Sequence, residues 1–141
     1  MKKSSVARPH FAPATARGAV PYGLGFLAYL PAPFFSMIVA GLVMAAVYPS
    51  QKRHGGIAAE NGRRAANWGL TVIAAMILIA GSFVWLSIAG QTESRFARAA
   101  GIPLACYFVL SVMHVVVILI GFLRANRSRV FYNPLAINFL R

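Results

Sequence analysis

The chain has 141 residues, of which 59% are hydrophobic and 11% charged, and its mean hydropathy is +0.67. This composition excludes an ordinary water-soluble domain, because it leaves too little polar surface to cover a core. The net charge of +12 would suit a nucleic-acid-binding protein, but the cations are divided among four short segments between apolar stretches. Cations beside apolar stretches are typical of membrane proteins, so we expect a membrane domain and no nucleic acid as partner.

The first apolar stretch, Gly18 to Gln51, contains no Asp, Glu, Lys or Arg and is too long for one span and too short for two full ones. The motif Pro31-Ala32-Pro33 divides it, because proline removes an amide donor and disfavours helix at the preceding residue. The stretch therefore predicts a short helical hairpin, with helices over about residues 19–30 and 34–48. Helix length leaves open whether the hairpin crosses the bilayer or is re-entrant.

Two further stretches without Asp, Glu, Lys or Arg follow, Ala65 to Thr92 and Ala99 to Leu123. A hydrocarbon core about 30 Å thick requires roughly 20 apolar residues per helix. Each stretch therefore predicts one full transmembrane helix, over about residues 66–89 and 102–123. The predicted fold class is an all-α integral membrane protein with a short hairpin and two full spans.

The distribution of charge predicts how the chain is oriented. Net charge is +4 for residues 1–18, +3 for 49–64 and +4 for 124–141, but only +1 for 92–98. Strongly basic segments stay in the cytoplasm, so the positive-inside rule predicts an N-in, C-in topology. The expected location is the bacterial cytoplasmic (inner) membrane, crossed more than once.

This topology divides the chain into three regions. Residues 1–18 are expected to form a flexible basic tail, and residues 19–123 a four-helix membrane domain with a basic cytoplasmic loop at 49–65. Residues 124–141 combine arginines with aromatic and aliphatic side chains. Such a composition favours a C-terminal tail that docks at the membrane interface.

Polar residues before and at the start of the third predicted helix form one candidate site. Glu60 precedes Arg64 by four residues, the favourable order for an ion pair on a helix. Asn67 carries an amide that needs a partner at the start of a span. A solvated first turn would explain these residues. The alternative is a fixed polar contact of Glu60, Arg64 and Asn67 with the other cytoplasmic segments.

His114 lies in the middle of the fourth predicted helix, where an ionisable side chain is a candidate ligand or proton relay. The three apolar stretches contain no Asp, Glu, Lys or second His to assist it. We therefore expect a neutral His114, hydrogen-bonded to a neighbouring helix through Ser111, Ser82 or a carbonyl group.

Residues for catalysis and metal binding are scarce. The whole chain has two acidic residues, Glu60 and Glu93, which are predicted on opposite sides of the membrane. It has no glycine-rich phosphate loop and no Cys and His residues at metal-binding spacing. We expect no enzyme, no catalytic residue, no bound metal and no cofactor.

Small residues four positions apart indicate where helices pack closely. Gly41 with Ala45, and Ala65 with Gly69, are two such pairs. Small side chains let neighbouring helix backbones approach in membranes. These pairs predict helix packing but no particular partner.

Several short motifs, taken in order, resemble a known family. The chain contains Leu27-Ala28-Tyr29-Leu30, then Ala66-Asn67-Trp68, then Ala125-Asn126 and Asn133-Pro134-Leu135. This order resembles a family of small bacterial membrane proteins of unknown function that are similar to the preprotein translocon component of the chloroplast inner envelope.

The resemblance covers about residues 20–140, and its pattern includes the positions of Tyr29, Asn67, Trp68, Asn126 and Pro134, of which Asn67 and Pro134 match. Family members often have a histidine where Tyr29 stands and a phenylalanine where Trp68 stands. Because no catalytic residues are established for that family, the resemblance implies none here.

Three functions follow as hypotheses. The first is a non-enzymatic accessory or assembly subunit of a membrane complex, or a homo-oligomer, whose basic face contacts anionic lipid headgroups or a membrane-protein partner. The alternative, implied by the resemblance, is a component of a protein- or solute-transport pore, which would need several copies because the spans offer few polar side chains. The third is a cofactor-binding redox subunit that depends on His114.

Overall fold

The computed structural model describes residues 17–91, 99 and 101–141, and the part of the chain described is entirely helical apart from turns and the C-terminal tail. The elements are α2 (Val20–Leu24), the 3-10 helix η1 (Gly25–Tyr29), α3 (Phe35–Ala46), α4 (Tyr48–His54), α5 (Gly56–Ala89) and α7 (Gly101–Asn126). The predicted fold class is confirmed: a short hairpin of α2, η1 and α3 accompanies two long apolar helices, α5 and α7.

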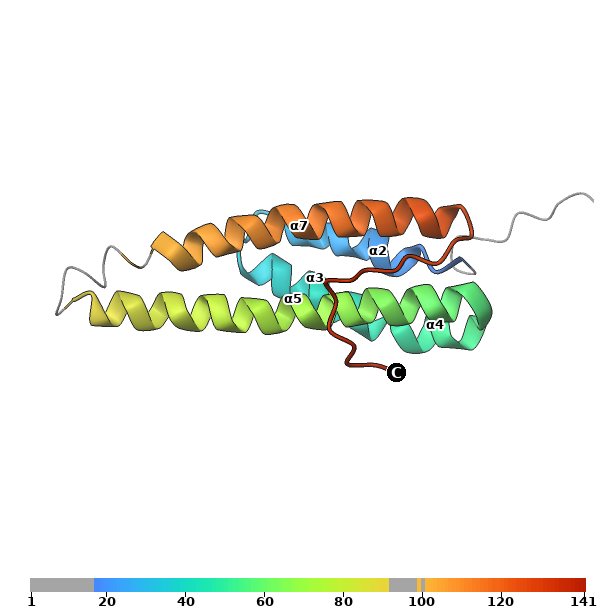
Figure 1. Cartoon of the computed structure of the whole chain (residues 1–141), viewed down its shortest axis with the longest axis horizontal. Helices are drawn as coiled ribbons and strands as arrows, with labels where there is room; N and C mark the ends of the chain where they lie inside the picture. Colours follow the sequence, from blue (N-terminus) through green and yellow to red (C-terminus); the bar gives the residue numbers. More distant parts are fainter. Residues whose placement is uncertain (1–16, 92–98, 100) are drawn as a thin grey trace, which may run out of the picture.

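Helices α5 and α7 lie side by side and run along the whole length of the molecule (Figure 1). They contain 34 and 26 residues. At 1.5 Å per residue their lengths are about 51 and 39 Å, which exceeds the hydrocarbon thickness of about 30 Å. Their most apolar windows are only 11% and 28% buried, so most of these apolar side chains face outwards. Outward-facing apolar side chains over such lengths are typical of helices in lipid.

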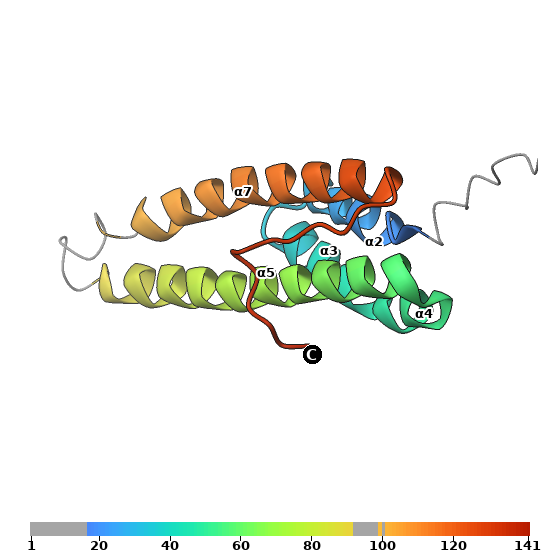
Figure 2. The ribbon, with the colours of Figure 1, turned by 45° about the vertical axis from the view of Figure 1, so that its right-hand side comes forward.

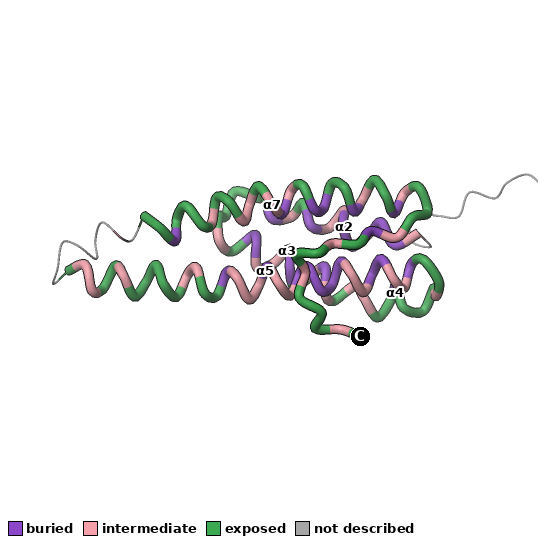
Figure 3. Tube along the Cα trace, viewed as in Figure 1, coloured by how far each residue is buried: buried purple, intermediate pink, exposed green. Residues whose placement is uncertain are grey.

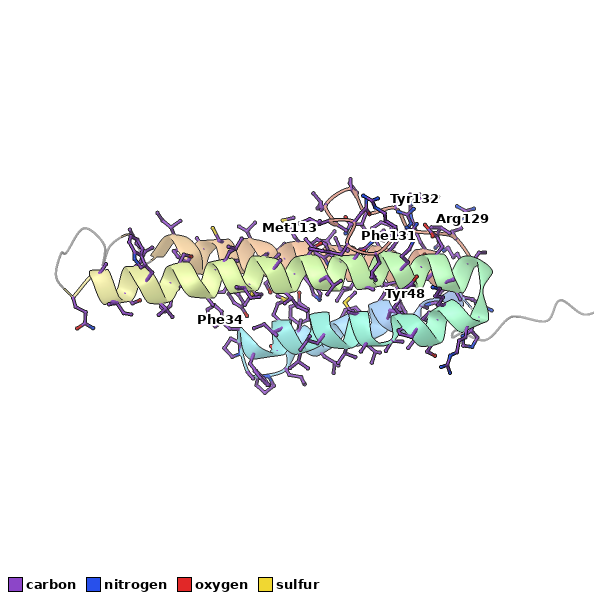
Figure 4. All side chains as sticks on the ribbon, turned by 90° about the horizontal axis from the view of Figure 1, so that it is seen from below. Phe34, Tyr48, Met113, Arg129, Phe131 and Tyr132 are labelled. Carbon is purple, nitrogen blue, oxygen red and sulfur yellow. The ribbon has the colours of Figure 1, made fainter. Side chains whose placement is uncertain are left out.

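The hairpin reverses direction at Pro31-Ala32-Pro33, as the prolines predict. The Ser36 hydroxyl donates a hydrogen bond of 2.8 Å to the Ala28 carbonyl and joins the two arms. Phe34, at the tip, has a positive φ of 67°, an unusual backbone conformation for a bulky residue. Its ring stacks on Tyr107 of α7 with the ring centroids 4.3 Å apart, which fixes the tip against α7 (Figure 4 labels Phe34 at this end of α3).

Residues 49–65, predicted as the basic connection between the hairpin and the third helix, consist of α4, a turn and the first turns of α5, which begins at Gly56. Between the two helices Gly55 and Gly56 have φ of 68° and 48°, which glycine adopts without steric cost, so the chain turns sharply there. The last turn of α4 carries Lys52 and Arg53, which interact favourably with the helix dipole.

The core fills only one half of the molecule's length, as the purple buried segments in Figure 3 show. Every buried residue of α5 lies between Ala58 and Met76, and those of α7 are, except Pro103, between His114 and Ala125. We call this part the packed half, because α2, η1, α3, α4 and the C-terminal tail lie beside it (Figures 1 and 2). Beyond it, α5 residues 77–89 and the part of α7 before Tyr107, which the tip of the hairpin reaches, form the bare half.

Helices α3 and α5 approach most closely where two glycines meet. A Cβ atom on Gly69 would lie 2.5 Å from the carbonyl oxygen of Gly41, and a Cβ on Gly41 would lie 2.7 Å from that of Gly69. Both contacts involve backbone, which side-chain rearrangement cannot relieve. The predicted close packing at these two small residues is therefore present, and it joins the hairpin to α5.

Arg17, the turn at Gly55 and the end of α7 lie at the same end of the molecule, and α5 ends and α7 begins at the other (Figures 1 and 2). This arrangement brings Arg17, the basic turn after α4 and the end of α7 together, as an N-in, C-in topology requires, while the predicted basic tail before Arg17 lies outside the described residues. We call this the basic end. Its position relative to a bilayer stays a prediction.

Candidate functional site

A buried hydrogen-bonded triad links three segments of the packed half. The indole nitrogen of Trp68 donates to Nδ1 of His114 over 3.1 Å, and Nε2 of His114 lies 3.0 Å from the carbonyl oxygen of Gly25. An indole N–H only donates, so Nδ1 must accept and Nε2 must carry the proton. These partners assign His114 as the neutral Nε2–H tautomer.

Both ring nitrogens of His114 are therefore occupied by the fold. The side chain is fully buried, and the Trp68 ring stacks on it at an interplanar angle of 19°. A metal or haem iron would need a free nitrogen lone pair, which this arrangement does not offer. Of the partners considered from sequence, the structure uses a carbonyl group and neither Ser111 nor Ser82, and Trp68 was missed as a partner.

The polar residues at the start of α5 form an ion cluster. Glu60 accepts hydrogen bonds from Nη2 of Arg63 at 2.9 Å and from Nε of Arg64 at 2.7 Å. The hydrogen bond from Arg63 is the main reason that the pKa of the Glu60 carboxyl is lowered, which keeps the carboxylate ionised. The sequence indicated Arg64 as a partner and missed Arg63. The guanidinium of Arg64 also lies over the ring of Tyr132, 3.7 Å from its centroid, so it contacts the C-terminal tail.

Asn67 fixes the end of that tail to α5. Its amide nitrogen donates to the Leu140 carbonyl at 3.1 Å, and its amide oxygen accepts from the Leu140 backbone N–H at 2.7 Å. One turn later, the Thr71 hydroxyl accepts from the backbone N–H of Ile137 at 2.9 Å. An extended tail beside a membrane helix needs such partners for its backbone groups, because lipid supplies none.

Asn61 fixes the beginning of the tail and the segment before α2. Its amide nitrogen donates to the carbonyl oxygens of Arg17 at 3.0 Å and Arg129 at 3.1 Å, and its amide oxygen accepts from the Phe131 N–H at 3.0 Å. The side chain is fully buried. Figure 4 shows Arg129 and Phe131, with Tyr132, grouped beside α5 on the side away from α3.

The residues Asn61, Arg64, Asn67 and Thr71, together with the tail residues they contact, form what we call the polar seam. They recur at intervals of three or four residues, so they share one face of α5. Sequence reasoning identified Arg64 and Asn67 but missed Asn61 and Thr71, although this spacing was available as a signal.

A pocket of about 300 Å³, which we call the basic cup, lies beside the polar seam. It is lined by Arg63, Arg64, Asn67, Asn138, Leu140 and Arg141. Among the described residues no group of three or more His, Cys, Asp or Glu side chains is placed to hold a metal ion. The chemistry available at this site is therefore recognition of an anion by guanidinium and amide groups.

Comparison with known families identifies the chain. Residues 22–140, which include α3, α4, α5, α7 and the polar seam, match the model of the magnetosome magnetite crystal formation protein family (MamF_MmsF). This match covers well over half of the 141 residues. The chain belongs to this family. Neither a curated protein nor a solved structure matches it.

Membership of the MamF_MmsF family corrects the resemblance drawn from short motifs. The chain matches a magnetosome family over the same stretch, and not the chloroplast translocon family. The transport-pore hypothesis loses the resemblance that supported it.

Four of the five positions in that pattern take part in contacts that hold the fold together. Trp68 donates to His114, Asn67 binds the Leu140 backbone, and the Tyr29 hydroxyl donates to the Ser111 carbonyl at 2.6 Å. The carbonyl of Asn126 accepts from Arg17 at 3.0 Å, and Pro134 lies exposed in the tail. Residues that hold a fold together indicate architecture and not activity, which is why the motifs led to the wrong family.

Proposed function

We propose that this protein acts in magnetite crystal formation as a small, non-enzymatic subunit of the magnetosome membrane. The observation that carries the proposal is the family match over residues 22–140, on a chain whose two long helices face outwards with apolar side chains. In this role it works as an accessory or assembly subunit, either as a homo-oligomer or with a membrane-protein partner.

The polar interior supports a structural role. The side chains that would attract an enzymatic interpretation, His114 and the amides of Asn61 and Asn67, are occupied by hydrogen bonds that join the hairpin, α5 and the tail. Groups engaged in this way stabilise one arrangement of segments and are not free to react.

The basic end supports a contact with negatively charged surfaces. In the predicted N-in, C-in orientation it faces the cytoplasm, where anionic lipid headgroups attract arginine and lysine. The opposite end then faces the magnetosome interior. Residues 92–98, which connect α5 to α7 and are predicted to lie on that side, are outside the described residues.

A gene-replacement experiment in the magnetite-forming source bacterium tests the proposal. We expect deletion to change the size or number of magnetite crystals seen by electron microscopy, and the wild-type gene to restore them. Gly69→Leu, which places a side chain against the α3 backbone, is expected to fail to restore them. Gly81→Leu is the matched control, because a Cβ at Gly81 meets nothing within 4 Å. Unchanged crystals in the deletion strain would contradict the proposal.

The assembly state is tested on protein purified in mild detergent. Multi-angle light scattering of the purified complex gives its protein mass. A mass that is a multiple of 15.2 kDa is expected for a homo-oligomer, and a stoichiometric second protein for a partner complex. A strictly monomeric protein without partner would contradict an assembly role.

A further inference from the structure

The basic cup has the charge and shape to hold a phosphate group. Three guanidinium groups, those of Arg63, Arg64 and Arg141, line it, and in the described part of the chain Glu60 is the acidic side chain that pairs with two of them, Arg63 and Arg64. The side chains therefore leave a net charge of +2 at this site. We propose that the basic cup binds the phosphate of an anionic phospholipid headgroup, an inference that rests on the proposed membrane location.

The cup is preorganised by the fold. Glu60 holds Arg63 and Arg64 through bonds of 2.9 and 2.7 Å, so both guanidinium planes are fixed before a ligand arrives. Its opposite wall is the tail, held by the paired hydrogen bonds between Asn67 and Leu140. A site whose donors are already ordered loses little conformational entropy on binding.

Donor groups remain available to a ligand. Nη1 of Arg63 has only a long contact of 3.5 Å to the Leu140 carbonyl, and Arg141 is exposed. Guanidinium groups bind phosphate oxygens through two parallel N–H bonds, which lysine cannot do. The arginines of the cup therefore suit a phosphate group, which can accept paired hydrogen bonds, better than a halide ion or a diffuse negative surface.

The surroundings of the cup favour a lipid over free phosphate. Ile137 and Phe139, next to it on the tail, are 55% and 49% exposed. They lie beside the start of the charge-free part of α5, since Ile137 binds Thr71. A phosphate in the cup would place acyl chains along these apolar side chains, so headgroup and chains are both accommodated.

Native mass spectrometry of the full chain in neutral detergent tests this proposal. The probes are phosphatidylglycerol, phosphatidylcholine and inorganic phosphate, each titrated separately. We expect phosphatidylglycerol to bind and Arg63→Gln with Arg141→Gln to weaken that binding about tenfold, as loss of charge-assisted hydrogen bonds implies. Arg63→Gln leaves Glu60 paired with Arg64, so the cluster persists.

The matched control is Arg53→Gln with Arg127→Gln, which removes the same charge from exposed positions at the basic end outside the cup. We expect it to keep the wild-type affinity. An equal loss in both double variants would overturn the proposal, because attraction would then be unspecific. Phosphatidylcholine binding as tightly would also overturn it.

The remaining measurements distinguish a lipid phosphate from free inorganic phosphate and check that each variant is folded. Inorganic phosphate binding as tightly as the lipid would overturn the lipid assignment. Circular dichroism and gel filtration check each variant, and if the double variant misfolds, Arg141→Gln alone is expected to weaken binding about threefold. Unchanged affinity in that variant overturns the proposal. The assay uses purified protein, so its outcome is independent of the crystal phenotype.

Discussion

Trp68 and His114 form a buried polar contact between α5 and α7. The Trp68 indole N–H is the donor that Nδ1 of His114 requires at 3.1 Å. A buried acceptor without a donor costs about 1–3 kcal/mol, whereas hydrogen bonds between membrane helices average about 0.6 kcal/mol. The pair is thus expected to contribute modestly to stability and strongly to the position of the Gly25 segment.

We expect Trp68→Phe to lower the free energy of unfolding by about 1 kcal/mol, because it keeps an aromatic ring but leaves Nδ1 of His114 unpaired. Denaturation by SDS in mixed micelles, followed by circular dichroism, measures this. Trp85→Phe on the bare half of the same helix is the comparison, and a smaller loss is expected there because Trp85 is 61% exposed. Equal losses in the two variants would contradict a special role for the buried contact.

At the residue scale, the sequence revealed local contacts and not distant ones. The Glu60–Arg64 ion pair follows from a spacing of four residues on a helix. The partner of His114 is 46 residues away, and the partner of Asn67 is 73 residues away. Those contacts depend on how α5 packs against α7 and the tail, which no local spacing specifies.

The crossing of α3 and α5 depends on the absence of a side chain at two glycines. We expect Gly69→Ala to destabilise the protein by about 1–3 kcal/mol, because its methyl group would meet the Gly41 carbonyl oxygen 2.5 Å away and push the helices apart. The same SDS titration gives the free energy of unfolding.

Gly81→Ala provides the control on α5, since its Cβ has open space. Here alanine is expected to leave stability unchanged or raise it by up to about 1 kcal/mol, through its higher helix propensity. The two substitutions are chemically identical, but only Gly69→Ala is expected to lower stability. A loss of equal size at Gly81 would contradict the crossing as the cause of the Gly69 effect, because helix propensity alone predicts a gain at both positions.

The elements were predictable where single residues constrain the backbone. Two prolines place the turn of the hairpin correctly, and the charge-free stretches give both long helices. Helix α4 was not predicted, because the charges of residues 49–65 report contact with water and not backbone conformation. The sequence did not predict the path of the C-terminal tail. That path depends on hydrogen bonds to Asn61 and Thr71, which lie far from the tail along the chain.

For the whole molecule, the predicted N-in, C-in topology is tested by cysteine labelling. In a Cys106→Ser background, single cysteines at Lys2, Arg53 and Arg127 are expected to react with a membrane-impermeant maleimide on intact purified magnetosomes, whose outer surface is the cytoplasmic face of the membrane. A cysteine at Ser94, which lies outside the described residues, is expected to react only after detergent opens these vesicles. Labelling of Lys2 and Arg53 from opposite sides would refute the topology.

The sequence predicted the helical membrane fold but not the family to which the chain belongs. Hydropathy and proline placement suffice for an all-helical membrane fold, because lipid restricts the chain to few alternatives. The family was misassigned from a few short motifs, whereas the match that corrects it uses residues 22–140 together. Short motifs that serve packing recur in unrelated proteins, so they say little about function.

The division into a packed half and a bare half gives the molecule a tapered outline (Figures 1 and 3). Around the basic end, α2, α3, α4 and the tail surround the two long helices, which continue alone to the far end. A tapered body displaces more lipid from one leaflet than from the other. In the predicted orientation the broader part occupies the cytoplasmic leaflet of the proposed magnetosome membrane, so the protein displaces more lipid there than the bare half displaces from the opposite leaflet.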